Sequence, residues 1–198
     1  MNYLAHARLS FEQPPIVVGN MISDHVKGKK QFDYPLSIQH GIRLHREIDG
    51  FTDTHAATEQ IKSFFKPHYR LYAGAFADVV YDHFLANDPG EFVNDDDLQQ
   101  FALSTYNILD NNYALLPPDF QTLLPYMKQY DWLYNYKTRE GIEKSFAGLV
   151  RRSKYLTESA VAFTIFNKHY DTLNLLYHDF YPDVKIFAAH QLQRLLNT

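Results

Sequence analysis

Helix-breaking residues divide this chain into segments of mostly about 12–20 residues, and this spacing constrains the fold most. The breaks fall at Pro14-Pro15, Gly28, Pro35, Pro67, Asp88-Pro89-Gly90, Pro117-Pro118, Pro125 and Pro182. Segments of this length suit helices, because strands are usually shorter. The one Asp-Gly pair, Asp49-Gly50, follows a helical pattern and does not join two alternating strands. The sequence therefore predicts an all-α fold, with helices near 14–25, 36–50, 54–66, 70–87, 96–112, 119–129, 138–151, 157–169 and 171–196.

Length, charge and cysteine content limit the class of protein. A chain of 198 residues suits one domain, so we expect residues 1–198 to form a single compact multi-helix domain. The absence of cysteine excludes disulfides, thiolate nucleophiles and Cys-based zinc or iron–sulfur sites. A net charge of −4 argues against a nucleic-acid binder. No signal peptide or transmembrane pattern appears, so we expect a cytoplasmic protein without membrane insertion; the oligomeric state stays open.

The segment Pro35 to Phe51, PLSIQHGIRLHREIDGF, places polar groups on an apolar helix face. At roughly 100° per residue, His45 and Asp49 lie within about 60° of the apolar positions 38 and 42, whereas Arg43 and Arg46 point toward the solvent side. Because a lone buried charge is costly, Asp49 needs a partner or a metal. A His and an Asp one turn apart can bind one ion together, so both are candidate metal ligands.

The segment Arg70 to Leu85, RLYAGAFADVVYDHFL, is apolar on nearly all sides, which predicts a central, buried helix. Asp78 and Asp82 lie one turn apart on it and would repel each other when ionised. They need a cation, and a divalent metal is the simplest one. His83 adds a titratable group. The alternative is that Asp78, Asp82 and His45 are hydrogen-bonded core groups that only fix helix packing.

Other acids and histidines give weaker signals. Asp24, in the Asp24-His25 pair that ends an apolar run, is a candidate ligand with little support of its own. His6, in LAHAR, is more typical of a structural or partly exposed histidine. His178-Asp179 is the only His-Asp dipeptide, but no other acid lies at a useful spacing from it. The run at 95–97 is typical of a solvated loop before a helix, because it lacks EF-hand spacing.

Several chemistries have no signal in this chain. There is no G-x-S-x-G elbow and no cysteine for acyl-enzyme catalysis, and no P-loop, G-x-G-x-x-G or H-E-x-x-H motif. No Glu is followed three residues later by His, as a ferritin-like di-iron site requires. The remaining combination, aspartate oxygens with imidazole, suits manganese, magnesium, iron or zinc in a hydrolytic site.

Five blocks of this sequence resemble one protein family nearly end to end. They read MNYLAHARLS, GNMISDHVKG, GIRLHREIDGFTDTH, YAGAFADVVYDHFL and HYDTLNLLYHDFYP. The chain resembles the acyl carrier protein phosphodiesterases, also called holo-acyl-carrier-protein hydrolases. The G-I-x-x-H-R-x-I-D and D-V-x-x-D-H-F-L blocks are specific in order and spacing, which favours a functional role for their acids and histidines.

The resemblance implies an all-helical fold similar to the HD-domain metal-dependent phosphohydrolases. It implies hydrolysis of the phosphodiester that joins 4′-phosphopantetheine to a serine of holo-acyl carrier protein, giving apo-acyl carrier protein and 4′-phosphopantetheine. It also implies a divalent metal that activates water, with manganese favoured over magnesium, iron or zinc. The residues of this chain in the family's blocks give the expected metal ligands and two catalytic histidines: Asp24, His45, Asp49, Asp78 and Asp82 as ligands, and His6 and His83 as catalytic groups. Arg43 or Arg46 would be the cation nearest the phosphate, although both project away from His45.

The implied partner, an acyl carrier protein, is small and acidic, so its docking surface should be basic. Two runs of basic residues are candidates, Lys27, Lys29 and Lys30 after Asp24, and Arg151, Arg152 and Lys154. Two other functions compete. One is a metal-dependent phosphohydrolase acting on a nucleotide or another small phosphoester, which needs no docking surface. The other is a non-catalytic helical binding module, which would bind no stoichiometric metal.

Overall fold

The computed structural model describes residues 1–197, and within that range every regular element is a helix. The α-helices are α1 (Tyr3–Arg8), α2 (Pro14–Ile22), α3 (Leu36–Thr54), α4 (Ala56–Tyr69), α5 (Ala73–Ala86), α6 (Asp95–Asn111), α7 (Pro118–Gln129), α8 (Trp132–Asn135), α9 (Arg139–Arg152), α10 (Ala160–Lys168) and α11 (Tyr170–Leu196). Short 3-10 turns are η1 (Ser23–His25), η2 (Gly28–Asp33), η3 (Arg70–Tyr72) and η4 (Tyr113–Leu115). The predicted all-α fold is confirmed, and each predicted helix has a counterpart. Only the short helices α1 and α8 were not predicted.

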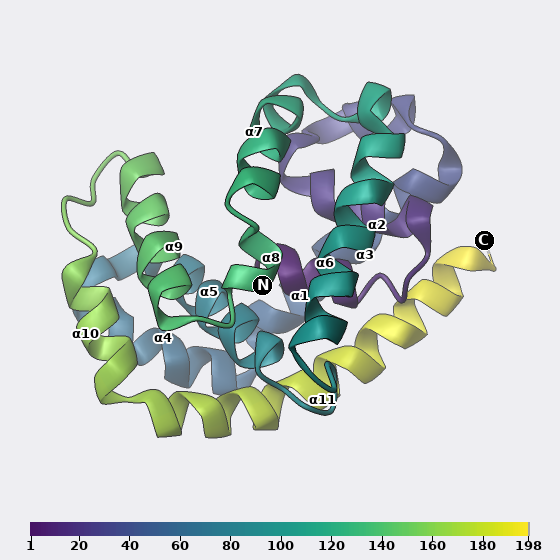
Figure 1. The fold of residues 1–198 in the computed structure, drawn as a ribbon. Helices are drawn as coiled ribbons and strands as arrows, with labels where there is room; N and C mark the ends of the chain where they lie inside the picture. Colours follow the sequence, from purple (N-terminus) through teal and green to yellow (C-terminus); the bar gives the residue numbers. More distant parts are fainter. Residues whose placement is uncertain (198) are drawn as a thin grey trace.

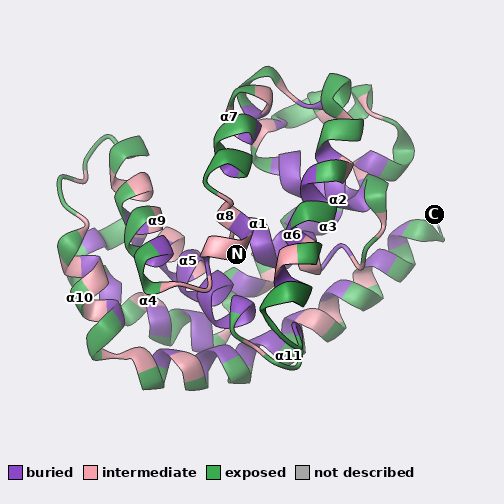
Figure 2. Ribbon diagram, in the orientation of Figure 1, coloured by how far each residue is buried: buried purple, intermediate pink, exposed green. Residues whose placement is uncertain are grey.

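Helix α5 lies at the centre of the fold, as its apolar sequence predicted. Figure 2 shows buried residues along α5 and along the inner faces of α2 and α3. Helix α11 packs along α3, α4 and α5 and crosses the base of the molecule in Figure 1. Phe180 stacks on Tyr81 of α5 with ring centroids 4.2 Å apart, which fixes the middle of α11 to the core. No helix in the described part of the chain is long and apolar enough to cross a membrane.

Two glycines bring α2 and α3 into direct backbone contact. A Cβ atom on Gly19 would lie 2.1 Å from the carbonyl oxygen of Ile38, and one on Gly41 would lie 2.5 Å from that of Ile16. Only glycine fits at such a crossing, because the neighbouring atoms belong to backbones that cannot rotate away. The end of α2 is thereby held beside the middle of α3, where His45 lies one turn after Gly41.

Replacing Gly41 with alanine should therefore push α2 away from α3. We expect the free energy of unfolding to fall by about 3 kcal/mol, as for other overpacked cores. Urea unfolding followed by circular dichroism measures this loss. Gly50 lies on the same helix, and nothing lies within 4 Å of the place that a Cβ atom would occupy there, so Gly50→Ala is a matched control that should not destabilise the protein. Equal stabilities of the two variants would contradict the close crossing.

Candidate metal centre

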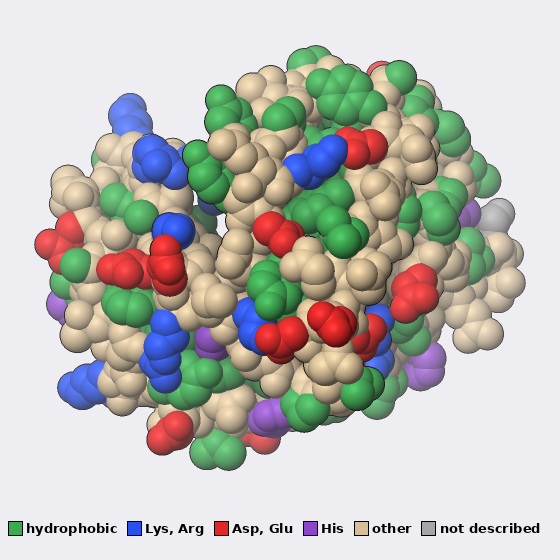
Figure 3. Space-filling model, viewed as in Figure 1, with side chains coloured by type: hydrophobic (Ala, Val, Ile, Leu, Met, Phe, Trp, Pro, Cys, Tyr) green, Lys and Arg blue, Asp and Glu red, His purple; other side chains and the backbone are tan. Residues whose placement is uncertain are grey.

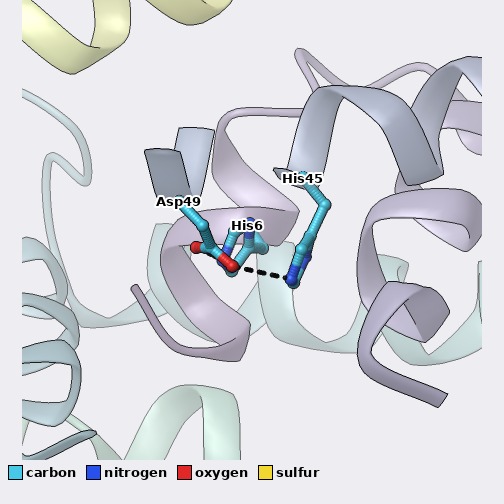
Figure 4. Close-up of side chains that lie close together, drawn as sticks. All are labelled: His6, His45 and Asp49. Carbon is cyan, nitrogen blue, oxygen red and sulfur yellow. Dashed lines mark ion pairs between the residues drawn. The ribbon is translucent and has the colours of Figure 1, made fainter. Parts of the chain in front are cut away.

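Helices α1 and α3 bring His6, His45 and Asp49 together at one point, as Figure 4 shows. One ligand atom from each residue lies within 4.8 Å of the others. The Nε2 atom of His45 is 3.1 Å from Oδ2 of Asp49, and Nε2 of His6 is 3.2 Å from Oδ1 of Asp49. Two imidazoles thus face the two oxygens of one carboxylate. His45 and Asp49 share one face of α3, as the helical spacing predicted, and α1 adds His6.

The orientation of His45 is fixed from α2. Its Nδ1 atom is 2.8 Å from the backbone carbonyl oxygen of Asn20, which can only accept, so Nδ1 carries a hydrogen. Nε2 is then the atom that faces the carboxylates. The side chain of Asn20 donates in turn to the carbonyl oxygen of His6 and to Ser10. Asn20 therefore ties both histidine-bearing segments together, in the way that supporting residues hold metal ligands.

His6 has no hydrogen bond of its own in this arrangement. Its ring is buried and stacks on the His45 ring, with centroids 3.9 Å apart and an interplanar angle of 16°. Neither Nδ1 nor Nε2 of His6 makes a hydrogen bond, although Nε2 is close to Asp49. A buried polar atom without a partner is costly, and a metal ion would relieve that cost. The donor set, two imidazole nitrogens and a carboxylate oxygen, fits a divalent transition metal.

The charges of the cluster favour a cation at this point. Burial opposes a charge on His45, but hydrogen bonds to Asp24 and Asp49 outweigh it and raise the pKa of His45 to about 9. Burial, together with the charge of His45, lowers the pKa of His6 to about 4. Burial raises the pKa of the Asp49 carboxyl, but the nearby rings of His45 and His6 and the Met1 ammonium lower it by more, so the pKa of Asp49 lies well below its usual value and the group stays ionised. The carboxylates thus stabilise a positive charge on His45, whereas the buried His6 is neutral at physiological pH.

Asp24 and Asp78 lie on two sides of this cluster. Asp24 is at the rim, with its side chain 74% exposed and Oδ1 3.2 Å from His45 Nε2. The hydrogen bond from His45 lowers the pKa of Asp24. Asp78 faces the α-ammonium group of Met1, which is 3.0 Å from Asp78 Oδ1 and 3.5 Å from Asp49 Oδ1. Burial raises the pKa of Asp78, and the ammonium opposes this. The Met1 ammonium therefore balances the negative charge of Asp78 in this structure.

Asp82 does not reach the cluster. It is fully buried beneath α1 and accepts hydrogen bonds from the backbone N–H groups of Asn2, Leu4 and Ala5, at 3.3, 2.8 and 3.3 Å. Its carboxylate therefore satisfies the free donors at the start of α1, as a capping group does. Asp78 and Asp82 thus have different partners in this structure, the Met1 ammonium for Asp78 and backbone N–H groups for Asp82.

His83 also lies outside the cluster, on another side of α5. Its Nδ1 atom is 2.8 Å from the carbonyl oxygen of Tyr136, and its Nε2 atom is 2.9 Å from the Tyr170 hydroxyl. Burial lowers the pKa of His83 to about 4, so it is neutral at physiological pH. Successive residues on a helix point about 100° apart, which explains why His83 does not follow Asp82 toward α1. In this arrangement His83 ties α5 to the segment after α8 and to α11.

Replacing His83 with glutamine should consequently cost stability and leave catalysis nearly intact. We expect the free energy of unfolding to fall by about 1–2 kcal/mol, the usual cost of disrupted buried hydrogen bonds. Turnover per folded enzyme should stay within about threefold of the original. Steady-state kinetics and urea unfolding measure both. His6→Gln is the contrasting variant, because it removes a nitrogen from the cluster. A large loss of kcat in His83→Gln at unchanged stability would return His83 to a catalytic role.

The other sequence candidates contribute no group to the cluster. Arg43 and Arg46 are exposed, as the helical wheel predicted. His178 and Asp179 are exposed on α11, and residues 95–97 form the first turn of α6. Sequence reasoning missed Asn20, whose signal was a polar residue inside the apolar run of α2.

Comparison with known proteins shows to which family the chain belongs. A sequence model described as acyl carrier protein phosphodiesterase matches residues 1–184. A protein of Yersinia pestis named acyl carrier protein phosphodiesterase is 31% identical over 191 residues, covering 96% of this chain and 99% of that protein. Proteins of the same name from Klebsiella pneumoniae and Photorhabdus laumondii are each 30% identical, covering 96% and 92% of this chain and 99% and 92% of their own lengths. No solved structure matches significantly. The chain therefore belongs to the acyl carrier protein phosphodiesterase family.

Proposed function

We propose that this chain is a metal-dependent phosphodiesterase that releases 4′-phosphopantetheine from the serine of holo-acyl carrier protein. The family match and the names of the relatives support the substrate. The observation that carries the chemistry is the His6–His45–Asp49 cluster, whose histidines are buried and whose rim carries the exposed carboxylate of Asp24. A substrate phosphate can approach the cluster only from an exposed side. We also propose that it acts in the cytoplasm.

We assign His6, His45 and Asp49 as metal ligands, with Asp24 as a further ligand from the rim. A divalent metal held there, with manganese as the proposed ion, would activate water and withdraw charge from the phosphate. Asn20 keeps Nδ1 of His45 protonated and so leaves Nε2 free to ligate. Asp24 is ionised at neutral pH, which suits a ligand or a proton acceptor and not a proton donor. The Met1 ammonium balances part of the negative charge of Asp49 and Asp78.

The experiment that tests this function follows the mass of holo-acyl carrier protein during incubation with the purified protein and manganese. We expect the carrier to lose the mass of its phosphopantetheine group, and we expect a chelator to stop the reaction. Parallel incubations with magnesium, iron and zinc identify the ions that support turnover.

Two results would contradict the proposal. Hydrolysis of nucleotides or other small phosphoesters with an intact carrier would indicate a different phosphohydrolase. No stoichiometric metal and no hydrolysis of any phosphoester would indicate a binding module without catalysis.

A further inference from the structure

One stretch of the chain is strongly basic although the whole chain is acidic. Residues 26–46 contain five basic side chains and one acidic one, Asp33, in a chain whose net charge is −4. The basic residues are Lys27, Lys29, Lys30, Arg43 and Arg46. All five are exposed. By contrast, acidic and basic side chains are interspersed on the face drawn in Figure 3. We call the surface formed by η2 and the first half of α3 the basic face.

The basic face contains a groove whose lining includes two exposed apolar side chains. The groove has a volume of about 350 Å³ and is lined by Gln31, Phe32, Leu36, Gln39, His40, Arg43 and Arg46. Phe32 and Leu36 are 66% and 61% exposed, which is unusual for large apolar side chains. His40 lies in the groove wall, and its buried Nδ1 atom has no hydrogen-bond partner. Cations around the exposed side chains of Phe32 and Leu36 fit an amphipathic helix that carries acids around an apolar side chain.

The basic face adjoins the rim of the metal centre. Arg46, the residue after His45, donates to the carbonyl oxygen of Val26 at 3.0 Å and to Gln31 Oε1 at 2.9 Å. These bonds hold the segment after Asp24 against α3. Asp24, the exposed residue of the rim, lies three residues before Lys27. The basic face and the candidate metal centre therefore share one edge.

We propose that the basic face is the docking surface for the acidic acyl carrier protein, with the groove receiving an apolar side chain of the carrier. The inference rests on the proposed function and deepens it. The scissile phosphorus is bonded directly to the carrier's serine oxygen, so the carrier's own surface must reach the rim of the metal centre. A docking surface separated from the metal centre by the length of the phosphopantetheine arm would not bring the bond between phosphorus and the serine oxygen to the metal centre. Opposite charges would also speed the encounter and make it sensitive to salt.

The test compares KM and kcat for holo-acyl carrier protein in Lys29→Glu/Lys30→Glu and in Phe32→Ala. We expect the charge reversal to raise KM roughly tenfold, to leave kcat within about twofold, and to weaken the dependence of KM on salt. Phe32→Ala should raise KM without changing the salt dependence. The matched control, Lys66→Glu/Lys168→Glu, makes the same change of charge at two exposed lysines of α4 and α10. Helix α10 lies at the opposite end of the molecule from α2 and α3 in Figure 1. The KM of this control variant for the carrier should equal that of the unaltered protein.

Manganese-dependent cleavage of bis(4-nitrophenyl) phosphate, a small diester, separates docking from chemistry. The variants should cleave it at the original rate, because docking does not affect it. An unchanged KM for the carrier in both basic-face variants would overturn the docking surface while leaving the proposed function intact. If Arg151→Glu/Lys154→Glu raises the KM for the carrier more than the basic-face variants do, the carrier docks at the end of α9, and the proposed docking surface is overturned as well. If the unaltered protein cleaves the small diester and not the carrier, the proposed function and this surface both fail.

Discussion

The Asp49→Asn variant is expected to lose manganese binding and, with it, turnover of holo-acyl carrier protein. Both carboxylate oxygens of Asp49 face a nitrogen of the cluster, Oδ1 toward His6 at 3.2 Å and Oδ2 toward His45 at 3.1 Å. An asparagine keeps the shape but turns an N–H group toward the cation and removes the negative charge. Loss of a supporting residue already lowers metal affinity about 10–100-fold, so loss of this ligand should exceed a hundredfold.

Two measurements check this result, titration calorimetry with manganese and the mass-based assay of the carrier. Asp53→Asn is the matched control, because Asp53 lies one turn after Asp49 on α3 and pairs with Lys62 on the surface. Its side chain is 72% exposed, so the control should bind manganese and turn over normally. Normal turnover in Asp49→Asn would remove Asp49 from the metal site and the cluster from the mechanism.

The helices could be predicted from the sequence because their apolar periodicity and their breaks are local properties. Helix α1 was missed because it has only six residues, too few for a periodic signal, and because its N-terminal donors are satisfied by Asp82 from a distant segment. Helix α8 is shorter still. The likeness to HD-domain phosphohydrolases stays a prediction, because no solved structure matches this chain significantly.

The sequence placed His45 and Asp49 on one helix face, and the structure brings them together. Spacing alone did not assign partners to the buried acids of α5. Asp78 and Asp82 share a face, yet one meets an ammonium group and the other meets backbone N–H groups. Only the packing of the first residues against α5 decides between these partners. The same packing brings His6 to the cluster, which no local pattern indicated.

The Asp82→Ala variant is expected to lose stability and to bind manganese more weakly, because Asp82 holds the helix that carries His6. The variant leaves the N–H groups of Asn2, Leu4 and Ala5 without their acceptor, and those of Leu4 and Ala5 are buried. One unsatisfied buried donor costs about 1–3 kcal/mol, so we expect the free energy of unfolding to fall by at least about 3 kcal/mol. Because α1 carries His6, manganese affinity should fall too. Asp179→Ala removes an exposed carboxylate of α11 and should change stability by less than about 0.5 kcal/mol.

A pH series separates the charge of Asp82 from its hydrogen bonds. Burial raises the pKa of Asp82 to about 7, although the three N–H bonds lower it. Between about pH 4 and pH 7 the unfolded state therefore loses this proton first, and the carboxyl disfavours folding more as the pH rises. The shift corresponds to at most about 4 kcal/mol. Asp82→Asn cannot titrate, so its stability relative to the unaltered protein should improve as the pH rises from 5 to 7 and stay level above that. Urea unfolding at each pH measures the difference, and a difference that does not change with pH would show that Asp82 keeps an ordinary pKa in the folded protein.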